Sequence, residues 1–147
     1  MRRLVNKRIV IGVTGGISAY KSAFLVRILR KNGADVRVVM TKNACEFVTP
    51  LTFQALSSRP VHTELLDLDA EAAMGHIELA KWADLIIIAP TSANFLARYA
   101  HGFAEDLLST LCLAADSPVM LAPAMNQNMW LNKATQENLN KITQWGI

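Results

Sequence analysis

IVIGVTGGIS, residues 9–18, joins an apolar run to a turn and then to a helix. Residues 9–13 are apolar and mostly β-branched, which is typical of a strand covered on both faces. From 18 to 32 the apolar side chains recur at helical spacing, basic residues crowd the last turns, and Gly33 marks the end. The stretch therefore predicts the strand–helix start of an α/β domain.

The same alternation of strand and helix continues along the chain. Further strands are expected at 36–40, 85–89 and 119–122, the last as a buried strand, and helices at 50–56, 76–82, 94–100, 105–115 and 133–144. The acidic stretch 60–73, which includes Glu71, is expected to be a solvated connection. Alternating strands and helices favour a parallel sheet with right-handed crossovers. We therefore predict a single flavodoxin-like (Rossmann-like) α/β domain over residues 1–147, a doubly wound open parallel sheet with helices on both faces.

Composition sets the broad class of the protein. With 52% hydrophobic and 18% charged residues in 147, the chain can fold around its own core and has apolar surface left for a subunit interface. Cys45 and Cys112 have neither CxxC nor metal-ligand spacing, so we expect free thiols, no metal and a cytoplasmic location. The net charge is +3, and no aromatic residues interleave with the basic residues near the start. We expect no nucleic-acid partner, no signal peptide and no membrane span.

Each predicted strand is followed by a polar segment. Residues 14–18 (TGGIS), 41–44 (TKNA), 90–94 (PTSAN) and 123–126 (PAMN) follow the four strands in turn. The carboxyl ends of parallel strands lie at one edge of the sheet, and open sheets of this kind bind ligands there. We therefore expect a polar ligand at this edge.

The glycine turn at 14–18 suits a phosphate. Its backbone N–H groups precede a helix, and Gly15 and Gly16 allow a close approach. The alternative is a tight turn capped by Ser18, and the sequence leaves both open. The turn is not GxGxxG, and the second strand ends in Met-Thr (40–41), where a dinucleotide fold usually has Asp or Glu. A mononucleotide is therefore favoured over a dinucleotide.

The segment PTSAN, residues 90–94, brings two hydroxyls and an amide together. Asn94 as a helix N-cap would explain the amide, but a cap does not require Thr91 and Ser92 as well. Contact with a ligand is therefore the favoured interpretation. The combination suits a flavin, whose ring edge and ribityl chain both need hydrogen-bond partners.

His76 is the candidate base among the three histidines. It begins an amphipathic stretch after Gly75, and histidine is the side chain that titrates near neutral pH. A structural role is the alternative and is commoner for a lone histidine. His62 and His101 lie in polar segments and are expected at the surface.

Four segments resemble the phosphopantothenoylcysteine decarboxylases of the homo-oligomeric flavin-containing cysteine decarboxylase superfamily: TGGISAYK, MGHIELAKWAD, PTSAN and PAMNQNMW. The resemblance covers residues 7–147, and PAMNQNMW (123–130) fits the PxMNxxMW signature at every fixed position. It is greatest to the flavoprotein half of bacterial members that also carry a phosphopantothenate–cysteine ligase. The resemblance implies a bound FMN and the conversion of 4′-phospho-N-pantothenoylcysteine to 4′-phosphopantetheine and CO₂ in coenzyme A biosynthesis.

The resemblance also implies roles for single residues. His76 matches the catalytic histidine, and Asn126 matches the asparagine that binds the substrate carboxylate. The matching FMN-binding residues are Gly15, Gly16, Ile17, Ser18, Thr41, Asn43, Phe47, Thr91, Ser92, Ala93, Asn94 and Ala124. Members are trimers or dodecamers built of trimers, with the flavin at a subunit interface, so we expect His76 to face a neighbour's flavin. Met125, Met129 and Trp130 are expected either to pack in the core or to wall the site.

Two departures from the family pattern bear on activity. Thr91 stands where members usually have Ala, and a small hydroxyl there should be tolerated. The family's acid is a cysteine on a substrate-covering flap beyond PxMNxxMW, and neither Cys45 nor Cys112 matches it, so we expect the flap and the ligase domain to be absent from residues 1–147. We expect residues 1–147 to bind FMN and support the oxidative decarboxylation, but to return the electrons poorly. The ratio of ene-thiol to phosphopantetheine among the products checks this expectation.

Three alternatives stay open at this point. A flavin prenyltransferase would share the fold and the first loop but has no reason to carry PxMNxxMW. A peptidyl-cysteine decarboxylase uses the same chemistry on a modified peptide. A non-enzymatic, flavin-binding regulatory subunit would keep the fold, although the presence of both His76 and Asn126 argues against it. Flavin colour and turnover of cysteine-bearing substrates would separate these classes.

Overall fold

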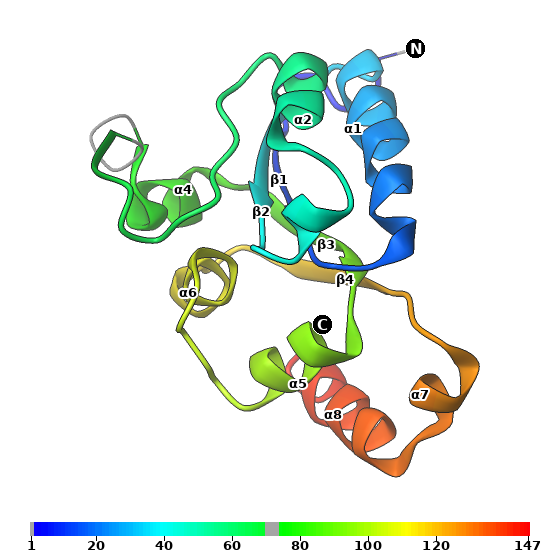
Figure 1. The fold of residues 1–147 in the computed structure, drawn as a ribbon. Coiled ribbons are helices and arrows are strands. Elements are labelled where there is room, and N and C mark those ends of the chain that lie inside the picture. Colours follow the sequence, from blue (N-terminus) through cyan, green and yellow to red (C-terminus); the bar gives the residue numbers. More distant parts are fainter. Residues whose placement is uncertain (1, 70–73) are drawn as a thin grey trace.

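Four parallel strands form the sheet in the part of the chain that the structure describes (Figure 1). The structure is a computed structural model that describes residues 2–69 and 74–147, and Glu71 of the predicted acidic connection lies outside them. The strands are β1 (Arg8–Val13), β2 (Asp35–Met40), β3 (Leu85–Thr91) and β4 (Val119–Pro123). They lie in the order β2-β1-β3-β4, and each of these pairings is parallel. The predicted α/β class and parallel sheet are confirmed.

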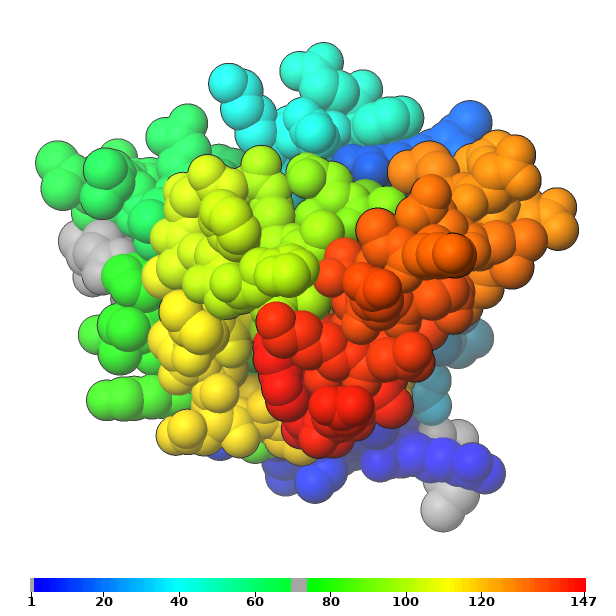
Figure 2. All heavy atoms as spheres, turned by 90° about the horizontal axis from the view of Figure 1, so that it is seen from below, coloured from blue at the N-terminus to red at the C-terminus, as the bar shows by residue number. Residues whose placement is uncertain are grey.

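Helices pack on both faces of the sheet. One face carries η1 (Ile17–Tyr20), α1 (Lys21–Lys31), η2 (Ala44–Glu46) and α2 (Pro50–Ser57). The other carries α4 (His76–Trp82), α5 (Ala93–Ala100) and α6 (Leu107–Ala114), and the chain continues after β4 into α7 (Gln127–Leu131) and α8 (Lys133–Thr143). Figure 2 shows the C-terminal α8, in red, lying against α5, in yellow-green. No helix in the described part of the chain is long and apolar enough to cross a membrane.

Side chains of β1 alternate between two cores. Ile9, Ile11 and Val13 pack with α1 and α2, whereas Val10 packs with α4, α5 and α6. Because successive strand residues point to opposite faces, one continuous apolar run supplies both cores. Directly after α1, Gly33 has a φ of 100°, as a glycine that ends a helix should.

Gly12 lets α6 lie directly on β1. A Cβ atom at this position would lie 2.5 Å from Leu108 Cδ1 and 2.8 Å from Ile88 Cδ1, so either side chain would have to move. Leu108 is fully buried in the first turn of α6, and Asp106, the N-cap of this helix, accepts from the Ser109 N–H at 2.8 Å. Gly12 therefore determines how closely the start of α6 approaches the carboxyl end of β1.

Three features of these elements differ from the predictions. β4 is an edge strand rather than a buried one: none of its residues is buried and Met120 is 55% exposed, because β3 pairs with it on one side only. α6 begins at Leu107 rather than at residue 105, because Asp106 is its cap. The sequence does not predict η2 and α7, because three and five residues show too little periodicity.

His62 is buried, and the expectation that it lies at the surface is wrong. Its backbone pairs with β2: the Met40 N–H donates to His62 O at 2.9 Å, and the His62 N–H donates to Val38 O at 3.0 Å. The polar connection thus extends the sheet locally. Desolvation lowers the pKa of His62, the positive charge of Arg37 lowers it further, and Asp67 opposes the change.

Acidification should destabilise the fold through His62. Its folded-state pKa lies below the unfolded value of about 6.5, so between the two values the unfolded chain binds more protons. The contribution to stability is complete above the unfolded value and is lost as the pH falls through the folded one. We expect the free energy of unfolding to decline below about pH 6.5, and to decline less steeply in His62→Gln. Urea unfolding at stepped pH measures this, and identical profiles for the two chains would contradict it.

Candidate functional site

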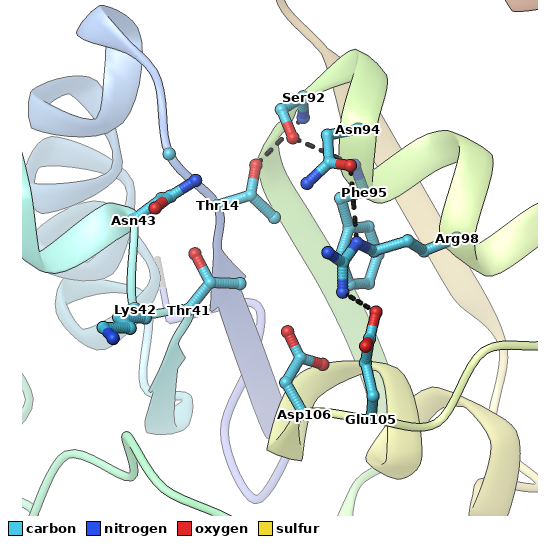
Figure 3. A pocket seen from close by; sticks show the side chains of 11 residues that line it. Thr14, Thr41, Lys42, Asn43, Ser92, Asn94, Phe95, Arg98, Glu105 and Asp106 are labelled. Atoms are coloured by element: carbon cyan, nitrogen blue, oxygen red, sulfur yellow. Dashed lines mark hydrogen bonds and ion pairs between the residues drawn. The ribbon is translucent and has the colours of Figure 1, made fainter.

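A cavity of about 320 Å³ opens at the carboxyl ends of the central strands (Figure 3). The loops after β1, β2 and β3 surround it together with the start of α6. It is lined by Thr14, Gly15, Thr41, Lys42, Asn43, Ser92, Asn94, Phe95, Arg98, Glu105 and Asp106. Five of the predicted cofactor-binding residues therefore come together here: Gly15, Thr41, Asn43, Ser92 and Asn94. We call this space the first cavity.

Thr14 ties the loop after β1 to the loop after β3. Its side chain, 1% exposed, donates to Pro90 O at 2.6 Å and accepts from the Ser92 N–H at 2.9 Å. The Thr41 N–H donates to Val13 O at 3.0 Å, which ties the loop after β2 to β1. Hydrogen bonds at the base of the first cavity thus hold its three loops together.

Replacing Thr14 with valine should destabilise the protein without changing its shape. The variant keeps the side-chain volume but leaves the half-buried Ser92 N–H without its acceptor and removes the hydroxyl donor from Pro90 O. An unsatisfied buried group costs about 1–3 kcal/mol, so we expect a loss of this size in the free energy of unfolding. Thr52→Val, at an exposed position, is the matched control and should change stability by less than about 0.5 kcal/mol. Equal urea midpoints for the two variants would contradict the role of Thr14.

Ser92, and not Asn94, caps α5. The Ser92 Oγ accepts from the Phe95 N–H at 3.1 Å, whereas Asn94 lies inside the first turn. The Asn94 Oδ1 accepts from Arg98 Nε at 3.4 Å, and its NH₂ group faces the first cavity in Figure 3. Ala93, between the two, is half-buried. The interpretation of Asn94 as the cap is therefore wrong, and its amide is available to a ligand.

Gly15 brings two loops into direct contact. A Cβ atom on it would lie 2.5 Å from Asn43 Cβ and 3.1 Å from the Asn43 carbonyl carbon. A Cβ on Gly16 would meet no atom within 4 Å. Gly15 is thus needed for the close approach of the loop after β2, and Gly16 leaves open space beside the backbone for a ligand.

Ser18 and Ala124 lie in a second cavity, of about 300 Å³. It is lined by Ser18, Lys21, Ser22, Leu25, Ala89, Pro90, Ala122, Pro123 and Ala124. The Ala124 N–H donates to Thr91 O at 3.1 Å and fastens the loop after β4 to β3. Ser18 lies inside η1, whose N-cap is Gly16, so the interpretation of Ser18 as a cap is wrong.

Five predicted cofactor-binding residues line neither cavity: Gly16, Ile17, Phe47, Thr91 and Ala93. Thr91 is fully buried and donates to Ile88 O at 2.7 Å, so its hydroxyl is occupied inside the strand end. Ile17 and Phe47 are exposed, by 84% and 54%. Their apolar side chains frame the ligand edge from outside, where a second molecule can cover them.

Charged residues at the rim of the first cavity are not predicted by the sequence patterns. Arg98 forms an ion pair with Glu105, and Lys42 and Asp106 complete the set. One signal in the sequence could have identified Arg98. It lies four residues after Asn94, and side chains at this spacing meet on a helix. Glu105 carries no comparable signal, because its position depends on how α6 packs.

His76 and Asn126 lie far apart in the chain's own fold. His76 is half-buried at the start of α4, while Asn126 is exposed and caps α7, its Oδ1 accepting from the Asn128 N–H at 2.8 Å. Figure 1 shows α4 and α7 on opposite sides of the molecule. Neither residue lines the two cavities described above. Of the residues after Pro123, Met129 is 49% exposed and does not belong to the core of this chain.

The two cysteines are free and remain protonated at neutral pH. Burial raises the pKa of Cys112 to about 12, with a smaller contribution from Asp106. Burial also raises the pKa of Cys45, and Glu46 adds to this effect. Over residues 2–69 and 74–147, no three His, Cys, Asp or Glu side chains are grouped as metal ligands would be. Hydroxyls, amides and charged groups are the polar side chains that line the first cavity.

A family model described as Flavoprotein matches residues 1–147. The chain belongs to the flavoprotein family. Membership of this family agrees with the position of the first cavity at the carboxyl ends of the strands, because open parallel sheets hold nucleotide ligands there.

Curated relatives of this flavoprotein are longer than the chain. It is 58% identical over 147 residues to the coenzyme A biosynthesis bifunctional protein CoaBC of Vibrio vulnificus (strain YJ016), with 100% of this chain and 37% of that protein covered. It is 58% identical over 144 residues to CoaBC of Escherichia coli (strain K12), with 98% and 36% covered. The chain thus spans little more than a third of the length of these relatives.

Solved structures show the same flavodoxin-like fold. The FMN-dependent cysteine decarboxylase SpaF superposes with a TM-score of 0.89 at 34% identity, covering 97% of this chain and 82% of that one. The PPC decarboxylase mutant C175S complexed with pantothenoylaminoethenethiol superposes with a TM-score of 0.79 at 32% identity. The match covers 96% of this chain and 79% of that one. The FMN-binding protein AtHal3 superposes with a TM-score of 0.82 at 33% identity, and the match covers 96% of this chain and 78% of that one.

Proposed function

We propose that this flavoprotein domain binds FMN and decarboxylates 4′-phospho-N-pantothenoylcysteine to 4′-phosphopantetheine in coenzyme A biosynthesis. The observation that carries the proposal is the match at 58% identity over the whole chain to CoaBC proteins. The likeness to PPC decarboxylase with a pantothenoyl ligand supports the same substrate class. The domain would thus be an FMN-dependent carboxy-lyase that acts in the cytoplasm.

The first cavity offers hydrogen-bond donors that suit FMN. The Thr41 hydroxyl accepts from the Ala44 N–H at 3.2 Å, so its own O–H is left to donate, and the same holds for the Ser92 hydroxyl. Asn94 adds an amide NH₂, and Gly15 a close backbone approach. When bound, FMN supplies a carrier that accepts two electrons and gives them back. The residues proposed to hold it are Gly15, Gly16, Ile17, Ser18, Thr41, Asn43, Phe47, Thr91, Ser92, Ala93, Asn94 and Ala124.

Asn126 and His76 are proposed to act on the substrate. The Asn126 Oδ1 is occupied by the Asn128 N–H, which leaves the NH₂ group to donate to the carboxylate that departs as CO₂. His76 would accept the substrate proton as a base, a role that imidazole suits. Both roles need the two residues within reach of one substrate.

A second copy of the chain would bring these residues together. α4, which begins with His76, and α7, which Asn126 caps, lie on opposite sides of one molecule (Figure 1), and this supports a site that combines residues from two copies. We therefore propose a homo-oligomer, a trimer or a dodecamer of trimers, in which His76 of one copy faces the FMN of its neighbour. Exposed apolar side chains on η1 and α1 supply surface for such contacts: Ile17, Tyr20, Phe24 and Ile28.

The test is a substrate assay on purified protein that shows flavin absorbance. We expect FMN in the protein and CO₂ release from 4′-phospho-N-pantothenoylcysteine, and no release from the analogue without the cysteine carboxylate. The products should be scored separately as ene-thiol and phosphopantetheine, because poor electron return by residues 1–147 stays a prediction. Colourless protein with no CO₂ release would contradict the proposal, and protein that binds flavin without releasing CO₂ would favour a regulatory subunit.

Decarboxylation of a peptide C-terminal cysteine is the second candidate. The TM-score of 0.89 with SpaF, an FMN-dependent cysteine decarboxylase, favours it, since the same fold serves the decarboxylation of a cysteine there. A peptide ending in cysteine, assayed beside the phosphorylated substrate, separates the two. We expect faster CO₂ release from the phosphorylated substrate.

A further inference from the structure

Arg98 and Glu105 form an ion pair at the rim of the first cavity (Figure 3). Arg98 comes from α5 and Glu105 from the segment before α6, and their side chains are 34% and 54% exposed. Both line the cavity. Arg98 Nε also donates to Asn94 Oδ1 at 3.4 Å, so the guanidinium lies between an amide of the proposed cofactor site and an external carboxylate.

Arg98 is the cation best placed to meet an anion in the cavity. Lys42 also lines the cavity, but its side chain is directed outward in Figure 3. Of the two carboxylates, Asp106 is engaged as the cap of α6 through the Ser109 N–H, whereas Glu105 pairs with Arg98. The charge that Arg98 offers to a ligand therefore depends on Glu105.

A phosphate ester is a stronger partner for Arg98 than Glu105 is. It carries about −1.5 to −2 charges near neutral pH and can accept two parallel bonds from the guanidinium fork. Asn94 and Glu105 use two of the N–H donors, so others remain for a ligand. A half-exposed carboxylate pairs weakly in water. An entering phosphate should therefore displace Glu105.

We propose that Arg98 binds the phosphate of the cofactor, and that Glu105 competes with this phosphate for the same guanidinium. The inference rests on the proposed binding of FMN in the first cavity. A flavin without phosphate leaves the Arg98–Glu105 pair intact and gains nothing from Arg98. The Arg98–Glu105 pair thus makes the site selective for the phosphorylated flavin over riboflavin.

The test compares FMN with riboflavin in flavin-fluorescence titrations of the apoprotein. In Arg98→Gln we expect FMN binding to weaken roughly 10–100-fold, as for the loss of a charge-assisted hydrogen bond. In Glu105→Gln we expect FMN binding to tighten by up to about fivefold, because an exposed competitor is removed. Riboflavin affinity should change less than about twofold in both, since it has no phosphate. Arg98→Lys, which keeps the charge but lacks the fork, should fall between wild type and Arg98→Gln.

Glu46→Gln is the matched control. It removes the same charge from an exposed residue near this edge that does not line the first cavity, so it should leave both affinities unchanged. Circular dichroism melts without ligand show whether each variant folds, and Glu105→Gln, at an exposed position, provides a second test if Arg98→Gln unfolds. Equal FMN affinities in wild type and Glu105→Gln, or parallel changes for FMN and riboflavin, would overturn this proposal alone. Failure of the wild-type chain to bind FMN would overturn the proposed function with it.

Discussion

His76→Asn should lower the rate of CO₂ release by about 10²–10⁴-fold, the usual contribution of a positioned acid or base. FMN should remain bound to the variant, because His76 does not line the first cavity. His101→Asn is the matched control: His101 is exposed, as the sequence indicates, and its Nε2 lies 3.0 Å from Asn138 Oδ1. Turnover is measured as CO₂ release, and cofactor content as flavin absorbance. Full turnover in His76→Asn would contradict its proposed role.

The same variant tests whether the site is shared between copies. Asn126→Ala alone should also be nearly inactive, because the carboxylate loses its amide donor. When His76→Asn and Asn126→Ala chains are co-expressed, mixed oligomers contain some sites with both native residues, one from each chain. We expect CO₂ release to recover in the mixture to a clear fraction of the wild-type rate. An inactive mixture of well-folded oligomers would contradict a site built from two copies.

Gly15→Ala should separate the loops that form the first cavity. The added methyl would lie 2.5 Å from Asn43 Cβ and 3.1 Å from the Asn43 carbonyl carbon, and backbone cannot yield as a flexible side chain can. Overpacking of this kind costs about 1–3 kcal/mol, so we expect that loss in unfolding free energy and a roughly 10–100-fold weaker FMN complex. Urea unfolding and flavin-fluorescence titration measure the two effects.

Two further variants test whether contact with Asn43 causes the effect of Gly15→Ala. Gly16→Ala should leave the stability of the apoprotein unchanged, since its methyl would meet no atom within 4 Å. Gly15→Ala combined with Asn43→Gly removes the nearer of the two clashes and should recover part of the lost stability. If Gly15→Ala and Gly16→Ala destabilise the apoprotein equally, contact with Asn43 is not the reason that residue 15 is glycine.

The strands and the ligand edge could be predicted from sequence because both depend on local patterns. Buried parallel strands are continuous apolar runs, and the polar segments that follow them share one edge by topology. All five predicted residues in the first cavity lie in these polar segments, after β1, β2 and β3. Their spacing alone is enough to bring them together.

Features that depend on distant packing were not predictable in this way. His62 is buried because its backbone pairs with β2, a non-local contact that a polar stretch does not indicate. Ser92 and Asn94 are both good caps, and only the register of α5 decides between them. Arg98 and Glu105 meet because α6 returns to the edge. His76 and Asn126 belong to separate elements, α4 and α7, whose distance in the fold no local pattern indicates.

The contact between Gly12 and Leu108 couples a residue inside the sheet to the charged rim. Leu108 follows Glu105 and Asp106 closely in sequence, and a Cβ atom at position 12 would lie 2.5 Å from its Cδ1, so the Leu108 side chain would have to move. Gly12 itself lines neither of the two cavities. For laboratory evolution, Gly12→Ala is therefore a way to perturb the start of α6 while every side chain that lines the first cavity stays the same.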